Sequence, residues 1–78
     1  MLADALEHLV RGIVDNPDDV RVTARPARRG ELLELRVNPA DLGRVIGRAG
    51  RTARALRTVV GSLTTTPVRI DVVDVDRR

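Results

Sequence analysis

The stretch Val45–Arg51 combines residues that are suited to binding an anion close to the main chain. Gly47 and Gly50 are three residues apart, and each is followed directly by an arginine, Arg48 or Arg51. Glycine readily adopts positive φ and allows another backbone to approach closely. A helix that begins after the second glycine exposes amides without intrahelical partners at the positive end of its dipole, where an anion is stabilised. The pattern therefore predicts a phosphate-binding loop between two short helices.

The charge distribution around this stretch also favours a polyanionic ligand. The 78-residue chain has a net charge of +3, and all of its basic residues are arginines. Residues 42–70 contain no acid and six of the arginines, whereas the remainder of the chain is acidic on balance. A block of one charge sign beside an oppositely charged remainder is typical of a polyanion-binding surface, although a solvated helix face is the alternative.

The residue types of the loop exclude a P-loop and a dinucleotide-binding site, and the chain does not have the residue pattern of an enzyme. A P-loop requires a lysine, which the chain lacks, and a dinucleotide fingerprint requires a third glycine and a preceding strand. No pair of carboxylates or activated nucleophile is evident, so we expect no catalytic residue and no cofactor. His8 is the only histidine and there is no cysteine, so we expect no metal site.

Two amphipathic patterns before the loop predict a helix and a hairpin. Apolar residues recur at helical spacing over 2–15, and Asn16-Pro17 ends that helix. Residues 20–25 and 31–37 alternate between apolar and polar side chains on either side of a turn that ends at Gly30. Alternation of this kind predicts two half-buried antiparallel strands.

The second half of the chain predicts two helices and a third strand. Asn38 is expected to cap a short helix that ends at Gly47, with Pro39 at its first position and Asp41 in its first turn. The next helix is expected over 51–60, with Gly61 left-handed at its C-terminus and Leu63 packing back on it. A strand is expected from residue 67, with a bulge or an end near residue 72.

These elements predict one α+β domain over residues 1–78. The order is α-β-β-α-α-β, with a core at about 20–75 preceded by the amphipathic helix 2–15. The alternating strands predict a three-stranded sheet that three helices cover on one face. The acidic start of the chain does not fit an export signal, and no apolar run is long enough to span a membrane, so we expect a cytoplasmic protein without a membrane partner.

The run VIGRAGRTARALR, flanked by a strand on each side, resembles the KH family, whose GxxG loop clamps about four nucleotides of backbone. The element order resembles the type II, prokaryotic KH fold over nearly the whole chain, and its length is similar to that of small bacterial single-KH proteins of the KhpA type. The resemblance implies binding of single-stranded RNA, as a post-transcriptional regulator or RNA chaperone. It also implies a homodimer, or a heterodimer with a larger KH protein of the KhpB (Jag, EloR) type.

The predicted RNA-binding residues surround the glycine pair. They are Arg44, Ile46, Gly47, Arg48, Ala49, Gly50, Arg51 and Arg54. One departure from many KH domains is Ala53, which stands where a large aliphatic side chain is common three residues after the second glycine. This departure bears on the base-binding groove and not on the fold.

Two other function classes remain open from the sequence. The residues around the loop could form a DNA-binding helix-turn-helix, although that fold usually packs a third helix on the pair. Alternatively, the chain could be a protein-assembly module whose basic face is incidental. The absence of Phe, Tyr and Trp argues against RNA-binding modes that depend on aromatic stacking.

Overall fold

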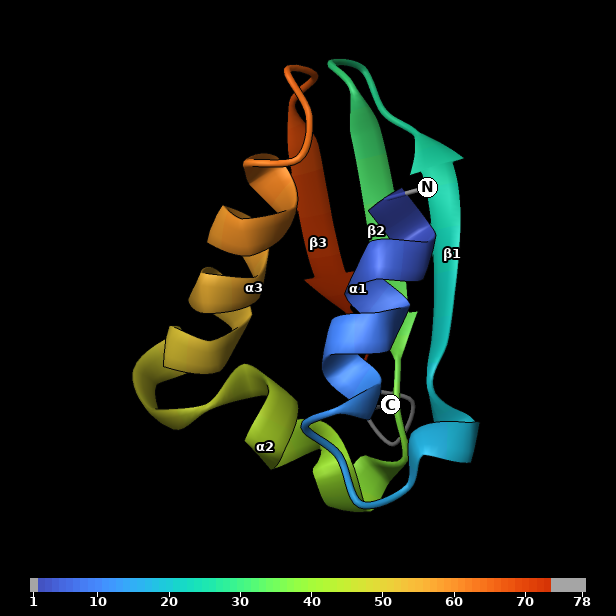
Figure 1. Cartoon of the computed structure of the whole chain (residues 1–78), viewed down its shortest axis with the longest axis vertical. Helices are drawn as coiled ribbons and strands as arrows, with labels where there is room; N and C mark the ends of the chain where they lie inside the picture. Colours follow the sequence, from blue (N-terminus) through green and yellow to red (C-terminus); the bar gives the residue numbers. More distant parts are fainter. Residues whose placement is uncertain (1, 74–78) are drawn as a thin grey trace.

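The computed structural model describes residues 2–73 and has the expected order of helices and strands (Figure 1). The principal elements are α1 (Leu2–Arg11), β1 (Arg21–Pro26), β2 (Glu31–Arg36), α2 (Leu42–Ile46), α3 (Arg51–Gly61) and β3 (Val68–Val72). Three short 3-10 helices join them: η1 (Pro17–Asp19), η2 (Pro39–Asp41) and η3 (Arg48–Gly50). The prediction of an α+β fold is confirmed.

The three strands form one mixed sheet in the order β1-β2-β3. The predicted hairpin is confirmed, because β1 and β2 pair antiparallel with Val22 opposite Leu35. Strand β3 pairs parallel to β2, with Ile70 opposite Leu33. A parallel pair requires a long crossover connection, and α2, η3 and α3 form it, so the glycine-rich loop lies in the middle of this crossover.

The core lies between the sheet and the helices, which all cover the same face of the sheet (Figure 1). The alternation in β2 is clear, since Leu33 and Leu35 are fully buried whereas Arg36 is exposed. From the helices, the buried side chains are those of Leu6, Val10, Val45, Leu56 and Val60. Strand β3 ends at Val72 as expected, and the Val73 amide still donates to the Leu35 carbonyl at 2.9 Å.

Two helix ends differ from the sequence prediction. Helix α1 ends at Arg11 rather than near residue 15, because Gly12 is a poor helix former and the chain turns there, although Val14 remains buried. Gly61 is not left-handed but is the last residue of α3. The amide of Ser62 donates to the carbonyls of Thr58 and Val59, so the helix ends without a left-handed residue, and Leu63 stays 58% exposed.

Candidate nucleic-acid interface

The loop between α2 and α3 has an unusual backbone, because three of its four residues have positive φ. Gly47 has φ 77° and ψ 168°, and Gly50 has φ 75° and ψ 16°. Ala49, which is not a glycine, has φ 56° and ψ 25°. The left-handed region costs an L-residue roughly 1–2 kcal/mol, so the loop holds Ala49 in a strained conformation of a kind that clusters at binding sites.

The two glycines are needed for different reasons. A Cβ atom at Gly47 would lie 2.7 Å from the Thr52 amide nitrogen and 2.8 Å from the Thr52 Cβ, so the loop packs directly on the first turn of α3. A Cβ atom at Gly50 would meet nothing within 4 Å, so only its positive φ favours glycine there. Gly47 therefore fixes the contact between the loop and α3, and Gly50 fixes the direction in which α3 begins.

The open amides of the loop lie slightly earlier than the sequence predicted. The Gly50 amide donates to the Gly47 carbonyl at 3.1 Å, and the Arg51 amide donates to the Arg48 carbonyl, so these two groups are occupied. Among residues 2–73, the amides of Arg48 and Ala49 have no hydrogen-bond acceptor, and both residues are exposed. The loop thus offers two successive main-chain donors to solvent at its tip.

Exposed arginines extend from this tip along α3. Arg48, Arg51, Arg54 and Arg57 are all exposed, and none of them forms an ion pair with another residue in the part of the chain that the structure describes. Arg44 differs from them, because its guanidinium lies 3.0 Å from the Asp15 carboxylate. The structure therefore brings Arg48, Arg51 and Arg54 to the loop as free positive charges and engages Arg44 with an acid.

Aliphatic surface adjoins the loop on the side of α2. Ile46 is the last residue of α2 and is 39% exposed, although it belongs to an apolar run that favoured the core. Ala53 in the first turn of α3 is half-buried. The loop is therefore bordered by an exposed aliphatic side chain and by a small one.

Asp41 has a structural role beside the loop that the sequence did not reveal. Its side chain is only 2% exposed and accepts hydrogen bonds from the amides of Asp15 and Asn16 and from the Asn16 side chain, at 3.0–3.2 Å. Burial alone raises the pKa of Asp41, but these hydrogen bonds and the nearby Arg44 charge outweigh it and lower the pKa below its usual range. Asp41 thereby ties the segment after α1 to the start of α2, directly before the loop.

The cap at Asn38 formed as predicted, with the Asn38 Oδ1 accepting from the Ala40 amide at 2.8 Å. The Asp41 carboxylate does not complete this cap, because it bonds the distant segment at residues 15–16 instead. No sequence signal identifies such a partner, since the two segments meet only in the folded chain.

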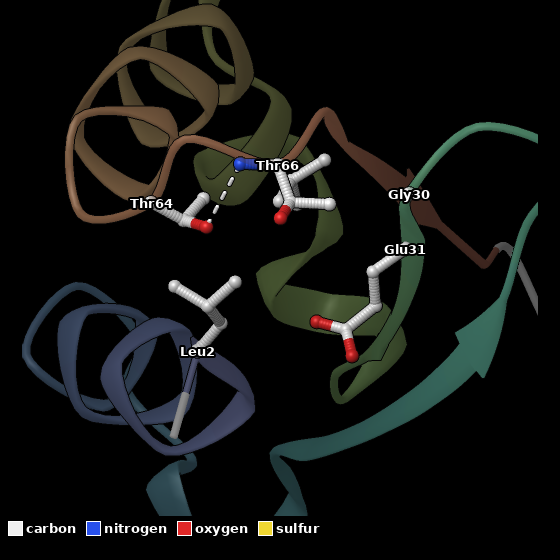
Figure 2. A pocket seen from close by; sticks show the side chains of 6 residues that line it. Leu2, Gly30, Glu31, Thr64 and Thr66 are labelled. Atoms are coloured by element: carbon white, nitrogen blue, oxygen red, sulfur yellow. Dashed lines mark hydrogen bonds between the residues drawn. The ribbon is translucent and has the colours of Figure 1, made fainter.

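A separate hollow of about 380 Å³ lies away from the loop (Figure 2). Leu2, Gly30, Glu31, Thr64, Thr66 and Val68 line it. This hollow contains a carboxylate and no arginine, so it repels phosphates and is not part of the interface. Within residues 2–73, no group of three or more potential metal ligands occurs and no helix is long and apolar enough to cross a membrane.

Comparisons with known proteins show the family of the chain. Residues 3–72 match the model of the family described as "KhpA/KhpB, KH domain". The chain is 70% identical to RNA-binding protein KhpA of Streptomyces coelicolor over 97% of its own length and 96% of the relative's. It is 60% identical to the protein of the same name from Mycobacterium bovis, over 99% and 96% of the two chains. The identity to that of Halalkalibacterium halodurans is 46%, over 88% and 95%.

No solved structure matched the chain. The family match nevertheless covers almost all of the described residues, and it includes every strand, the whole GxxG loop and every helix except for Leu2 at the start of α1. The chain therefore belongs to the KhpA/KhpB family of KH domains.

Proposed function

We propose that this protein binds single-stranded RNA without catalysing a reaction. The loop Gly47–Gly50 grips the backbone of about four nucleotides, as GxxG loops of KH domains do. Three relatives named RNA-binding protein KhpA, at 46–70% identity, support this function, and the family is non-enzymatic. The RNA-contacting residues are Gly47, Arg48, Ala49, Gly50, Arg51 and Arg54, with Ile46 beside the bases and Arg44 as a flanking charge.

The observation that carries the proposal is the pair of amides at Arg48 and Ala49. Both belong to exposed residues and have no acceptor among residues 2–73. A phosphate oxygen supplies the missing acceptor, and a hydrogen bond to a charged oxygen is stronger than one to a neutral group. The free guanidinium groups of Arg48 and Arg51 add charge on both sides of the same place.

An unpaired strand fits this loop better than a duplex does. A single strand can turn its bases away from the phosphates, and Ile46 offers them an exposed aliphatic surface. The helix-turn-helix alternative lacks support, because α2 and α3 form the crossover between the parallel strands β2 and β3 of one sheet, which is not the all-helical arrangement of that motif, although α1 contacts α3. Without aromatic stacking, which contributes roughly 1–3 kcal/mol per base, a single copy binds modestly.

Because a single copy binds RNA modestly, the proposal includes pairing of two KH domains. Pairing with a second copy, or with a larger KH protein of the KhpB type, would link two loops and raise the avidity for one RNA. Such a unit acts on transcripts in the cytoplasm as a post-transcriptional regulator or RNA chaperone. If the chain were only an assembly module, the loop would be dispensable for all of its binding.

The test replaces Arg48 and Ala49 together by aspartate. Aspartate tolerates positive φ and both positions are exposed, so the fold should persist. We expect this variant to lose nearly all binding to a single-stranded RNA, and any residual binding to show a salt slope smaller by about one or more. Filter binding or fluorescence anisotropy against salt concentration measures both quantities.

The matched control is the double substitution Arg36→Asp and Ala40→Asp, which changes the net charge equally at two exposed positions outside the loop. It should keep most of the wild-type affinity. Equal losses in the two variants would mean that only net charge matters and would overturn the proposed loop contact. Stronger binding of duplex DNA than of single-stranded RNA by the wild type would favour the DNA-binding alternative.

A further inference from the structure

A second cluster of arginines, which form no ion pair within residues 2–73, lies at the turn between β1 and β2. Arg28 and Arg29 belong to this turn, and Arg69 belongs to β3 beside it. These three side chains, with Ala27 and Pro67, line a hollow of about 330 Å³ that contains no acidic residue. We call this feature the turn-end hollow. None of the RNA-contacting residues of the proposed function contributes to it.

The backbone around the turn-end hollow is fixed by close contacts. Gly30 has φ 92°, and a Cβ atom there would lie 2.8 Å from the Pro67 carbonyl carbon, so only glycine lets the turn pack against the start of β3. The Glu31 amide donates to the Pro67 carbonyl at 3.0 Å, and the Ala27 amide donates to the Gly30 carbonyl at 3.1 Å. Arg28 and Arg29 are therefore carried by a turn that is anchored next to Arg69.

The charge of the turn-end hollow is not neutralised by ion pairs. Arg28, Arg29 and Arg69 are exposed, and none of them pairs with an acid within residues 2–73. The nearby Arg25 does pair, with Glu34. Asp71 lines an adjoining hollow of about 260 Å³ with Arg69, so the positive charge is concentrated on the side of Arg28 and Arg29. Like charges held together repel each other, and a bound anion relieves that repulsion.

The chemistry of this hollow is better suited to the phosphate groups of RNA than to the surface of a membrane. Guanidinium groups bind phosphate oxygens in a two-pronged geometry, and arginines from two segments of the chain line this hollow. The large exposed apolar residues, Ile46, Val59 and Leu63, all lie outside the hollow. It therefore has no apolar anchor that could insert into lipid.

The turn between β1 and β2 lies at one end of the long axis of the molecule, which spans 32 Å, and the loop between α2 and α3 lies in the other half, at the side (Figure 1). Helix α3 runs from the loop towards the turn end of the sheet (Figure 1). Arg51, Arg54 and Arg57 on this helix are exposed. No acid interrupts the chain from Leu42 to Ile70. A strand that leaves the loop along α3 would thus meet the arginines up to Arg57 and then an uncharged stretch, residues 58–68, before the hollow.

We propose that the turn-end hollow is a second phosphate-binding site, at which Arg28, Arg29 and Arg69 hold the backbone of the same RNA outside the segment gripped by the GxxG loop. This inference rests on the proposed function, because it assigns a second contact to the same ligand. Its consequence is a dependence on RNA length, since an RNA that is too short to reach the hollow gains nothing from it. Two linked contacts bind more tightly than either contact alone.

The experiment compares two single-stranded RNAs, one of about four nucleotides, which only fills the GxxG loop, and one of about 25, which is longer than the whole molecule. The variant is Arg28→Gln, Arg29→Gln, Arg69→Gln, and the control is Arg11→Gln, Arg36→Gln, Arg21→Gln, which removes equal charge elsewhere on the surface. For the longer RNA we expect about tenfold weaker binding by the variant than by the control, and a salt slope smaller by about two. For the shorter RNA we expect equal affinity.

Each outcome decides between the two proposals. If the variant and the control bind the longer RNA with equal affinity, the proposal of a second phosphate-binding site is wrong. Equal losses for both RNA lengths also overturn it, because the arginines would then act through general charge or stability, which thermal unfolding of the variant checks. Failure of the wild type to bind either RNA would instead overturn the proposed function itself.

Discussion

At the scale of single residues, the two glycines of the GxxG loop are required for different reasons. Gly47 is required by the space that Thr52 occupies and also by its positive φ, whereas Gly50 is required by φ alone. Ala49 adopts positive φ without being a glycine, so the surrounding contacts hold a strained residue at the tip. The tip therefore presents its two open amides in a fixed direction, which lowers the entropy that binding must remove.

The first prediction compares Gly47→Ala with Gly50→Ala. Replacing Gly50 should lower the free energy of unfolding by about 1–2 kcal/mol, the cost of a left-handed L-residue. Replacing Gly47 should cost more than Gly50, because the new methyl group also collides with the backbone of Thr52. Urea denaturation followed by circular dichroism measures both values. Equal losses would mean that the loop moves away from α3 without cost, contrary to the close packing described above.

At the scale of the elements, Asp41 joins parts of the chain that are distant in sequence. Asp41 lies immediately before α2, and its carboxylate accepts hydrogen bonds from the amides of Asp15 and Asn16. Arg44 of α2 forms an ion pair with Asp15. Helix α2 has only five residues, and a helix so short is not stable alone. These contacts hold α2, and with it the first glycine of the loop, against the segment that follows α1.

The second prediction concerns the pH dependence that Asp41 confers. Because its folded-state pKa is lowered, its ionisation stabilises the fold above the unfolded pKa of about 3.9. That contribution is lost as the pH falls below this value and through the folded-state pKa. We expect Asp41→Asn to be less stable than the wild type at pH 7, and the difference between the two proteins to shrink as the pH falls below about 4.

Thermal unfolding between pH 2 and 7 measures this difference. Asp15→Asn is a useful control, because it removes the exposed pair with Arg44 but keeps the Asp15 amide that donates to Asp41. Exposed ion pairs contribute little, so the control should remain close to the wild type. A stability gap for Asp41→Asn that stays constant with pH would contradict the assigned role of the ionised carboxylate.

At the scale of the whole molecule, a small core must support a strained loop. A domain of this size buries only about 60% of its unfolded surface, and its stability is expected at the low end of about 5–15 kcal/mol. Leu33 lies at the centre of the sheet and is fully buried beneath the helices. The neighbouring Leu32 points to the opposite, open face and is only half-buried.

The third prediction uses this pair as a matched comparison. Leu33→Ala should lower the free energy of unfolding by about 2–5 kcal/mol through lost burial and a cavity, which leaves the folded state only marginally stable. Leu32→Ala removes the same atoms from the open face and should cost about 1 kcal/mol or less. Circular dichroism on heating measures both. Similar losses would mean that the open face is also covered, for example by a partner.

The sequence predicted the fold well because periodicity reports which face of an element is buried. The alternation around Leu33 and Leu35 and the cap at Asn38 led to elements that the structure confirms. The positions of the two glycines correctly placed the loop between two helices. What could not be read was set by contacts between distant segments or by local helix geometry, as at Asp41, at Arg44 with its partner Asp15, and at Gly61.

The parallel pairing of β2 with β3 has a consequence for synthesis of the protein. The GxxG loop is translated before β3, yet α3 packs on β3 and the crossover closes only when β3 joins β2. A nascent chain that has reached the end of α3 therefore has the loop residues but lacks the strand that holds α3 in place. The loop therefore acquires its fixed shape only after the ribosome has passed residue 72, and under the proposed function a chain still being extended through β3 does not yet bind RNA through it.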